Sequence, residues 1–143
     1  MTQIDQAKLS QIARKYGVLN LRLFGSATKN WETARDLDFA VLGSRELTLL
    51  EQAGLISELE DLCRKTVDLI VIAREMPLLL ASEIGSTSIA VWEEPVRGRQ
   101  SYAVEIDRLM ALAEDEKLSF PMELRLKSLD NQIRKFNVSG NSN

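Results

Sequence analysis

Residues 23–42 read LFGSATKNWETARDLDFAVL and contain the strongest structural signals of the chain. The apolar segment 18–24 ends at Gly25-Ser26, which predicts a strand followed by a turn. Segment 36–42 is a second predicted strand, with acidic residues at its start and apolar residues after them. Residues 27–34 between the two strands are polar, so we expect one helical turn and a loop there.

Two acidic residues open the second strand. Asp36 and Asp38 are two positions apart, so both carboxylates point to one face of the strand. Two like charges side by side are costly, and carboxylate oxygens suit Mg²⁺ bound together with substrate phosphates. Asp68 begins the next apolar strand. If the two strands are neighbours, Asp68 completes a three-carboxylate cluster able to hold two metal ions for in-line phosphoryl or nucleotidyl transfer.

The turn between the two strands offers groups that suit phosphate. Gly25 lets the backbone approach a ligand closely, and Ser26 adds a hydroxyl and an N–H at the start of the expected helical turn. Lys29 and Arg35 follow as cations, and each is interpreted either as a phosphate contact or as a surface charge. The sequence therefore places a candidate phosphate site next to the acidic pair.

Helical and strand patterns alternate over the first two thirds of the chain. Apolar spacing and turn residues predict helices at 5–16, 45–64 and 77–83, and strands at 18–24, 36–42, 67–72 and 88–93. The predicted fold class is α/β (α+β): a small mixed β-sheet of about four strands flanked by helices, with further helices at the C-terminal end.

Residues 97–136 show helical spacing and no strand pattern. Two stretches, 99–116 and 119–136, carry more apolar surface than a four-stranded domain is expected to cover. We therefore expect a domain at 1–96, a helical extension that binds a partner or joins two copies, and a flexible tail at 137–143.

The composition excludes several classes of protein. A chain of 143 residues, 45% of them hydrophobic, fits one globular domain with at most an appendage. One cysteine, Cys63, and no histidine exclude an internal disulfide, a Cys/His zinc site and a Ser-His-Asp triad. Without histidine, the carboxylates of Asp and Glu are the candidates for a general base. The net charge of −3 disfavours nucleic acid as a partner.

No leader or membrane span is recognisable in the sequence. The first residues lack a basic region followed by an apolar stretch, and no apolar run approaches the roughly 18 residues of a membrane helix. We expect a cytoplasmic protein without membrane association.

The spacing of these motifs resembles a known family. Nine residues separate Gly25-Ser26 from Asp36-Leu37-Asp38. The minimal nucleotidyltransferases of the DNA polymerase beta superfamily carry Gly-Ser, then nine to eleven residues, then Asp-x-Asp. Val67-Asp68-Leu69 is similar to the strand that bears the third acidic residue of that family. The resemblance covers roughly residues 5–95.

The resemblance implies a fold and a set of roles. Asp36 and Asp38 would hold Mg²⁺, Asp68 would complete the metal site or act as a base, and Gly25 and Ser26 would bind the phosphates of ATP. Stand-alone members of this size resemble the antitoxin half of toxin–antitoxin pairs with a HEPN-domain ribonuclease. For such a pair the resemblance implies transfer of AMP from ATP onto a tyrosine of the toxin.

Two alternatives remain open at the level of sequence. Arg35 stands where family members commonly have serine, and a cation beside the acidic pair favours an inactive antitoxin that neutralises its partner by binding alone. Transfer of a nucleotide to a small molecule or to tRNA shares the same chemistry. It needs an acceptor pocket, and the enzymes that do this are generally larger, so we rank it last.

Overall fold

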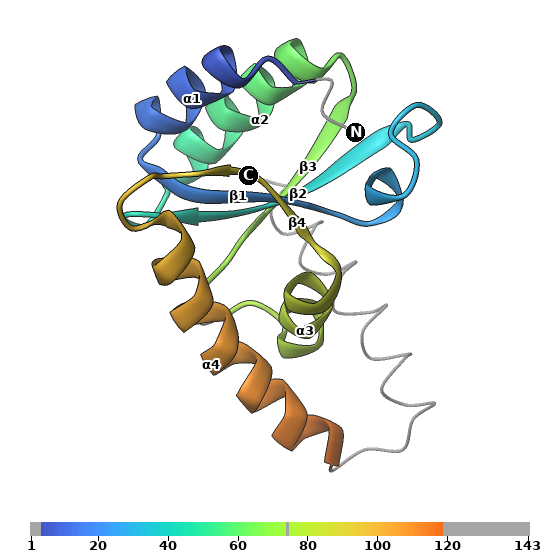
Figure 1. Cartoon of the computed structure of the whole chain (residues 1–143), viewed down its shortest axis with the longest axis vertical. Helices are drawn as coiled ribbons and strands as arrows, with labels where there is room; N and C mark the ends of the chain where they lie inside the picture. Colours follow the sequence, from blue (N-terminus) through green and yellow to red (C-terminus); the bar gives the residue numbers. More distant parts are fainter. Residues whose placement is uncertain (1–3, 74, 119–143) are drawn as a thin grey trace.

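A computed structural model describes residues 4–73 and 75–118, in which helices cover a single sheet (Figure 1). In chain order the elements are α1 (Gln6–Lys15), β1 (Val18–Phe24), the 3-10 helix η1 (Ser26–Thr28), β2 (Asp36–Gly43), α2 (Leu49–Cys63), β3 (Thr66–Val71), α3 (Leu78–Thr87), β4 (Ile89–Glu93) and α4 (Gly98–Leu118). The strand order is β3-β2-β1-β4. Strands β2 and β3 are parallel, and β1 is antiparallel to both of its neighbours. The predicted mixed sheet of four strands is confirmed.

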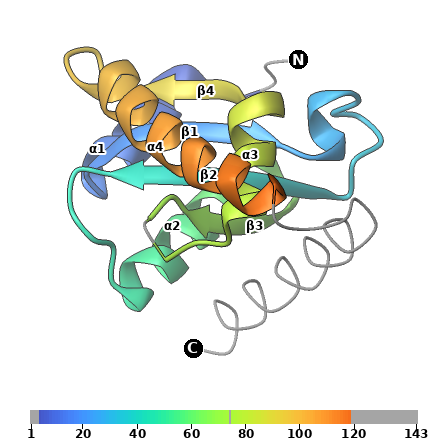
Figure 2. The same ribbon diagram turned by 90° about the horizontal axis from the view of Figure 1, so that it is seen from below.

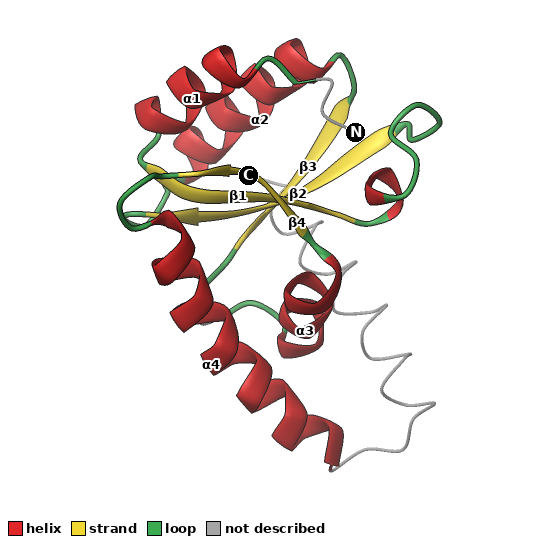
Figure 3. Ribbon diagram, viewed as in Figure 1, coloured by secondary structure: helices red, strands yellow, loops and turns green. Residues whose placement is uncertain are grey.

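Helices lie on both faces of the sheet (Figure 3). α1 and α2 cover one face, over a core that includes the fully buried Leu37 and Phe39 of β2. α3 and α4 lie over the other face, as the view from below shows (Figure 2), on a second core that includes Ala40 of β2. Because side chains alternate along a strand, Asp36 and Asp38 share the face of Ala40 and belong to the side of α3 and α4.

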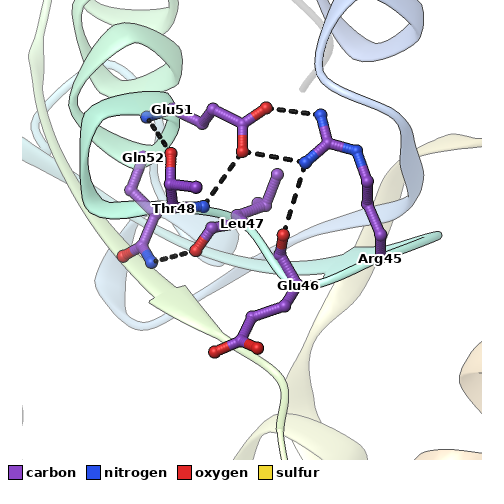
Figure 4. A network of polar contacts seen from close by, with 6 residues as sticks. All are labelled: Arg45, Glu46, Leu47, Thr48, Glu51 and Gln52. Carbon is purple, nitrogen blue, oxygen red and sulfur yellow. Dashed lines mark hydrogen bonds and ion pairs between the residues drawn. The ribbon is translucent and has the colours of Figure 1, made fainter.

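The start of α2 differs from the prediction, which began a helix at residue 45. The helix begins at Leu49 because Thr48 is its N-cap in a capping box (Figure 4). The Thr48 hydroxyl accepts the backbone N–H of Glu51 at 3.1 Å, and the Glu51 carboxylate accepts the backbone N–H of Thr48 at 3.0 Å. Arg45, outside the helix, forms an ion pair with the same Glu51 carboxylate. These contacts hold the chain in a turn before the first helical residue.

The end of α3 corrects a second expectation. Gly85 was expected to close a helix at 77–83, but α3 continues through it to Thr87. A Cβ atom at this position would collide with the Met110 side chain of α4 and lie 3.0 Å from Ile106 Cγ1. The glycine therefore lets α3 and α4 pack closely and does not end the helix.

The remaining expectations divide into those within the described residues and those outside them. The predicted helix at 99–116 corresponds to α4, whereas the predicted helix at 119–136 and the tail at 137–143 lie outside the described residues. The division of the chain at residue 96 stays a prediction. Across 4–73 and 75–118, no helix has the length and apolar character of a membrane span. Cys63 is a free, half-buried thiol, and its burial raises its pKa to about 11.

Candidate active site

The parallel pairing of β2 and β3 brings the three predicted acidic residues to one end and one face of the sheet. Asp38 is the direct register partner of Asp68, and Asp36 is the partner of Thr66. Residues paired in register on neighbouring strands point to the same face, and Asp36 lies two positions before Asp38. Asp36 is exposed, whereas Asp38 and Asp68 are partly buried. The structure therefore places these carboxylates on one side of the sheet, as the sequence predicted for neighbouring strands.

The pKa values of Asp38 and Asp68 are both raised at this end of the sheet. Burial, followed by the charges of Asp68, Asp36 and Glu83 in that order, raises the pKa of Asp38 to about 6. Burial is also the main reason that the pKa of Asp68 is raised, followed by the charges of Asp36 and Glu60. Among the described residues, no ion pair or hydrogen bond reaches the side-chain carboxylate of Asp36, Asp38 or Asp68. A nearby cation would favour the charged form of these carboxylates.

Gly25 brings the turn after β1 into contact with this cluster. Its φ of +78° lies in a region that side-chain-bearing residues rarely adopt, and a Cβ there would lie 2.5 Å from Asp38 Oδ2. The next residues form η1, in which the hydroxyl of Thr28 donates to the carbonyl oxygen of Gly25 at 2.7 Å. Ser26 is exposed. The Gly-Ser turn and Asp38 thus share one corner of the molecule.

The two predicted phosphate-binding cations, Lys29 and Arg35, form no ion pair with the three acidic residues. Lys29 ends η1, where its backbone N–H donates to the carbonyl oxygen of Ser26 at 3.1 Å, and its side chain is exposed. Arg35 is also exposed and lines a hollow together with Glu60 and Arg64 of the region where α2 ends. No charge–charge effect of Arg35 contributes to the raised pKa of Asp38. The phosphate contacts suggested for Lys29 and Arg35 stay predictions.

One acidic residue near the cluster was missed by the sequence analysis. Glu83 of α3 is partly buried, and its charge contributes to the raised pKa of Asp38. It lies on a helix, far from Asp38 in the sequence, and no motif marks it. Only the packing of α3 against the sheet reveals that it faces the same region.

The donor chemistry of the cluster suits a divalent cation. Carboxylate oxygens are the ligands that Mg²⁺ prefers, and burial followed by neighbouring carboxylates raises the pKa of both Asp38 and Asp68. Across the described part of the chain, however, no three His, Cys, Asp or Glu side chains lie close enough together to hold a metal ion as they stand. Asp36, Asp38 and Asp68 as metal ligands therefore stay a prediction.

The comparison with protein families agrees with the fold and with the position of these motifs. Residues 7–95 match the model of the family described as polymerase beta, nucleotidyltransferase. The chain belongs to the polymerase beta nucleotidyltransferase family. The match includes β1, the Gly-Ser turn, β2, β3 and β4, so the whole sheet is that of this nucleotidyltransferase fold. No match to a curated protein was found.

Solved structures with the same fold include members of toxin–antitoxin complexes. A chain in a crystal structure of a toxin–antitoxin with AMP-PNP is 18% identical, with a TM-score of 0.66, over 90% of this nucleotidyltransferase chain and 98% of that chain. A second match is a chain in the structure of a tri-AMPylated Shewanella oneidensis HEPN toxin in complex with an MNT antitoxin. It is 19% identical, with a TM-score of 0.64, over 92% of this chain and 98% of that chain. At this level of identity the matches show a shared fold.

Proposed function

We propose that this chain is a Mg²⁺-dependent nucleotidyltransferase that transfers AMP from ATP onto a hydroxyl group of a partner protein. The observation that carries the proposal is the register pair of Asp38 and Asp68, with Asp36 on the same face and Gly25 against Asp38. Membership of the nucleotidyltransferase family supports the reaction type. ATP supplies the AMP group, and pyrophosphate is the second product.

Each group of the site has a role in this reaction. Asp36, Asp38 and Asp68 would hold Mg²⁺, which stabilises the developing charge on the phosphate oxygens when it is bound. Gly25 and Ser26 would cradle the β- and γ-phosphates, and we propose that Lys29 and Arg35 assist them. The acceptor oxygen attacks the α-phosphorus, the bond from that phosphorus to the bridging oxygen breaks, and pyrophosphate leaves. If Asp68 does not complete the metal site, it is the group we propose to take the proton of the acceptor hydroxyl.

We further propose that the acceptor is a tyrosine of a HEPN ribonuclease toxin and that the chain is its antitoxin. The support comes from proteins of the same fold: one matched chain lies in a toxin–antitoxin complex named MntA-HepT, and another lies in a complex with a tri-AMPylated HEPN toxin. Both matches cover at least 97% of those chains.

The experiment uses purified chain, Mg²⁺, ATP labelled in its α-phosphate, and a purified HEPN-domain protein as acceptor, with the product of the neighbouring gene as the first choice. We expect label on the HEPN protein with the wild-type chain and at least a hundredfold less with Asp38→Asn, since a removed metal ligand costs this order of rate. Asp107→Asn, which removes an exposed carboxylate of α4, is the matched control and should transfer as the wild type does. No label with the wild-type chain, or equal label with both variants, would contradict the proposal.

A binding-only antitoxin is the second candidate. The observation that favours it is the absence, among the described residues, of three acidic side chains already close enough to hold a metal ion. Titration calorimetry with Mg²⁺-ATP separates the two candidates. Binding that is lost in an Asp36→Asn, Asp38→Asn double variant favours the enzyme. Inhibition of the toxin by that variant without nucleotide favours the binding module.

A further inference from the structure

Helix α3 packs against the sheet beside the acidic residues. Its Leu80 and Ile84 are fully buried in the second core. The same core contains Phe24 of β1 and Ala40 of β2. Phe24 is the register partner of Asp38, and Ala40 lies two positions after Asp38 on the same face of β2. The helix therefore covers the sheet surface directly next to Asp38.

Glu83 lies on the flank of α3 that is turned away from α4. Gly85 of the same helix faces the Met110 side chain of α4. Successive residues of an α-helix are rotated by about 100°, so Glu83, two positions before Gly85, points roughly 160° away from that contact. Leu80 and Ile84, which face the sheet, are its neighbours around the helix. Because the Glu83 side chain is partly buried, it lies at the margin of the contact between α3 and the sheet.

The Glu83 carboxylate acts on Asp38 and is not neutralised. Its charge contributes to the raised pKa of Asp38. The charges that raise the pKa of Asp68 are instead those of Asp36 and Glu60. Within the described part of the chain, no ion pair or hydrogen bond reaches the Glu83 carboxylate. Glu83 is therefore an unpaired negative charge on the Asp38 side of the acidic cluster.

The Asp38 side of the cluster is also the side of the Gly-Ser turn. A Cβ atom on Gly25 would lie 2.5 Å from Asp38 Oδ2, and this turn is where the phosphates of ATP are proposed to bind. Glu83 therefore adds negative charge to the region where a metal ion and the triphosphate would meet. By Coulomb's law a carboxylate attracts a divalent cation and repels a phosphate group that has no cation with it.

We propose that Glu83 makes nucleotide binding depend on a divalent cation: its charge strengthens the binding of the cation at Asp38 and weakens the binding of ATP that lacks a cation. The inference rests on the proposed function and assigns a specificity-determining role to a residue of α3, outside the Asp-x-Asp motif. Glu83 acts on both ligands through space and does not have to coordinate the ion. Removal of its charge should therefore change the two affinities in opposite directions.

Two other roles for Glu83 lead to different expectations. If the carboxylate coordinated the ion directly, its removal would weaken cation binding at every salt concentration, and shortening it to aspartate would weaken binding as well. If Glu83 only supported the fold, its removal would weaken the binding of both ligands. An effect of charge at a distance is instead screened by salt and is retained by aspartate.

Three variants separate these roles. Glu83→Gln removes the charge and keeps the size of the side chain, whereas Glu83→Asp keeps the charge. Glu46→Gln is the matched control, since Glu46 is exposed and follows β2, at the other end of the strand from Asp38. Circular dichroism and thermal unfolding check that each variant folds as the wild type does.

The probe for the cation is Mn²⁺ alone, which suits the same oxygen ligands as Mg²⁺. At low ionic strength, electron paramagnetic resonance of free Mn²⁺ should show about threefold weaker binding to Glu83→Gln, with Glu46→Gln and Glu83→Asp close to the wild type. In EDTA, titration calorimetry should show about threefold tighter binding of metal-free ATP to Glu83→Gln. Both differences should vanish in 1 M KCl, where the screening length falls to about 3 Å.

Several results would overturn the inference. They are no Mn²⁺ binding by the wild type, an Mn²⁺ or metal-free ATP affinity that Glu83→Gln leaves unchanged, a fall of both affinities in that variant, a difference that persists in 1 M KCl, and a Glu83→Asp variant that behaves as Glu83→Gln does. The expected binding results without AMP transfer by the wild-type chain would contradict the proposed function alone. The Mn²⁺ measurement needs neither nucleotide nor acceptor protein, so it tests Glu83 separately.

Discussion

At the scale of single residues, Gly25 and Asp38 depend on each other. The positive φ of Gly25 and the 2.5 Å gap between its absent Cβ and Asp38 Oδ2 leave no room for a side chain. Gly25→Ala should therefore lower the free energy of unfolding by about 1–2 kcal/mol and displace the Asp38 carboxylate. Chemical denaturation measures the first effect and AMP transfer the second. Ser26→Ala changes an exposed neighbour and should leave the free energy of unfolding unchanged. An equal loss of folding stability in the two variants would contradict this reasoning.

Asp38 should also make the stability of the fold depend on pH. Its pKa of about 6 exceeds the ordinary aspartate value of 3.8, so the folded state binds a proton more readily than the unfolded state. Stability should then fall as the pH rises from about 4 to about 6 and stay lower above it. Since Asp38 is partly exposed, we expect solvent screening to limit this loss to about 1–2 kcal/mol.

Asp38→Asn isolates this effect. Asparagine carries no charge, so the variant should be about 1 kcal/mol more stable than the wild type at pH 7 and nearly equal to it at pH 4. Denaturant unfolding at the two pH values measures the difference. A variant that is less stable than the wild type at pH 7 would show that Asp38 makes a favourable contact. We thus expect the charged Asp38 carboxylate to lower the stability of the fold at neutral pH.

At the scale of secondary structure, the capping box is what begins α2. Thr48→Ala removes the hydroxyl that accepts the Glu51 N–H, and loss of such a cap costs about 1 kcal/mol. We expect this decrease in thermal or denaturant unfolding of the whole chain. Ser57→Ala changes an exposed position in the middle of the same helix and should be neutral or slightly stabilising. Equal effects of the two changes would mean that the cap does not determine the helix start.

Elements differ in how well their sequence patterns predict them. The strands at 18–24, 36–42, 67–72 and 88–93 were found within about one residue of their bounds, because their apolar runs end at turn residues. Gly85 was misread because a glycine that ends a helix and a glycine that admits a neighbouring helix look alike in one sequence. The difference lies in Met110 and Ile106 of α4, which no local pattern near Gly85 reveals.

At the scale of the whole molecule, the candidate site depends on pairing between distant strands. The spacing of Asp36 and Asp38 indicated a shared face, but their proximity to Asp68 required β2 and β3 to be parallel neighbours. Such pairing depends on the path of the chain through α2, and the prediction was therefore conditional on it. Glu83 was outside the reach of the sequence analysis, since its place near Asp38 arises only where α3 packs against the sheet.

Ligand binding at the acidic cluster of Asp36, Asp38 and Asp68 should stabilise the whole fold. A ligand that binds only the folded chain adds about 2.7 kcal/mol at a concentration one hundred times its dissociation constant. For a chain of this size, that gain corresponds to a rise in melting temperature of roughly 8 °C. We expect this rise with Mg²⁺-ATP, its loss when a chelator removes Mg²⁺, and its absence in the Asp36→Asn, Asp38→Asn double variant. An equal rise in that variant would show that the nucleotide binds elsewhere, whereas no rise in the wild type would leave the acidic cluster without the ligand that its charge calls for.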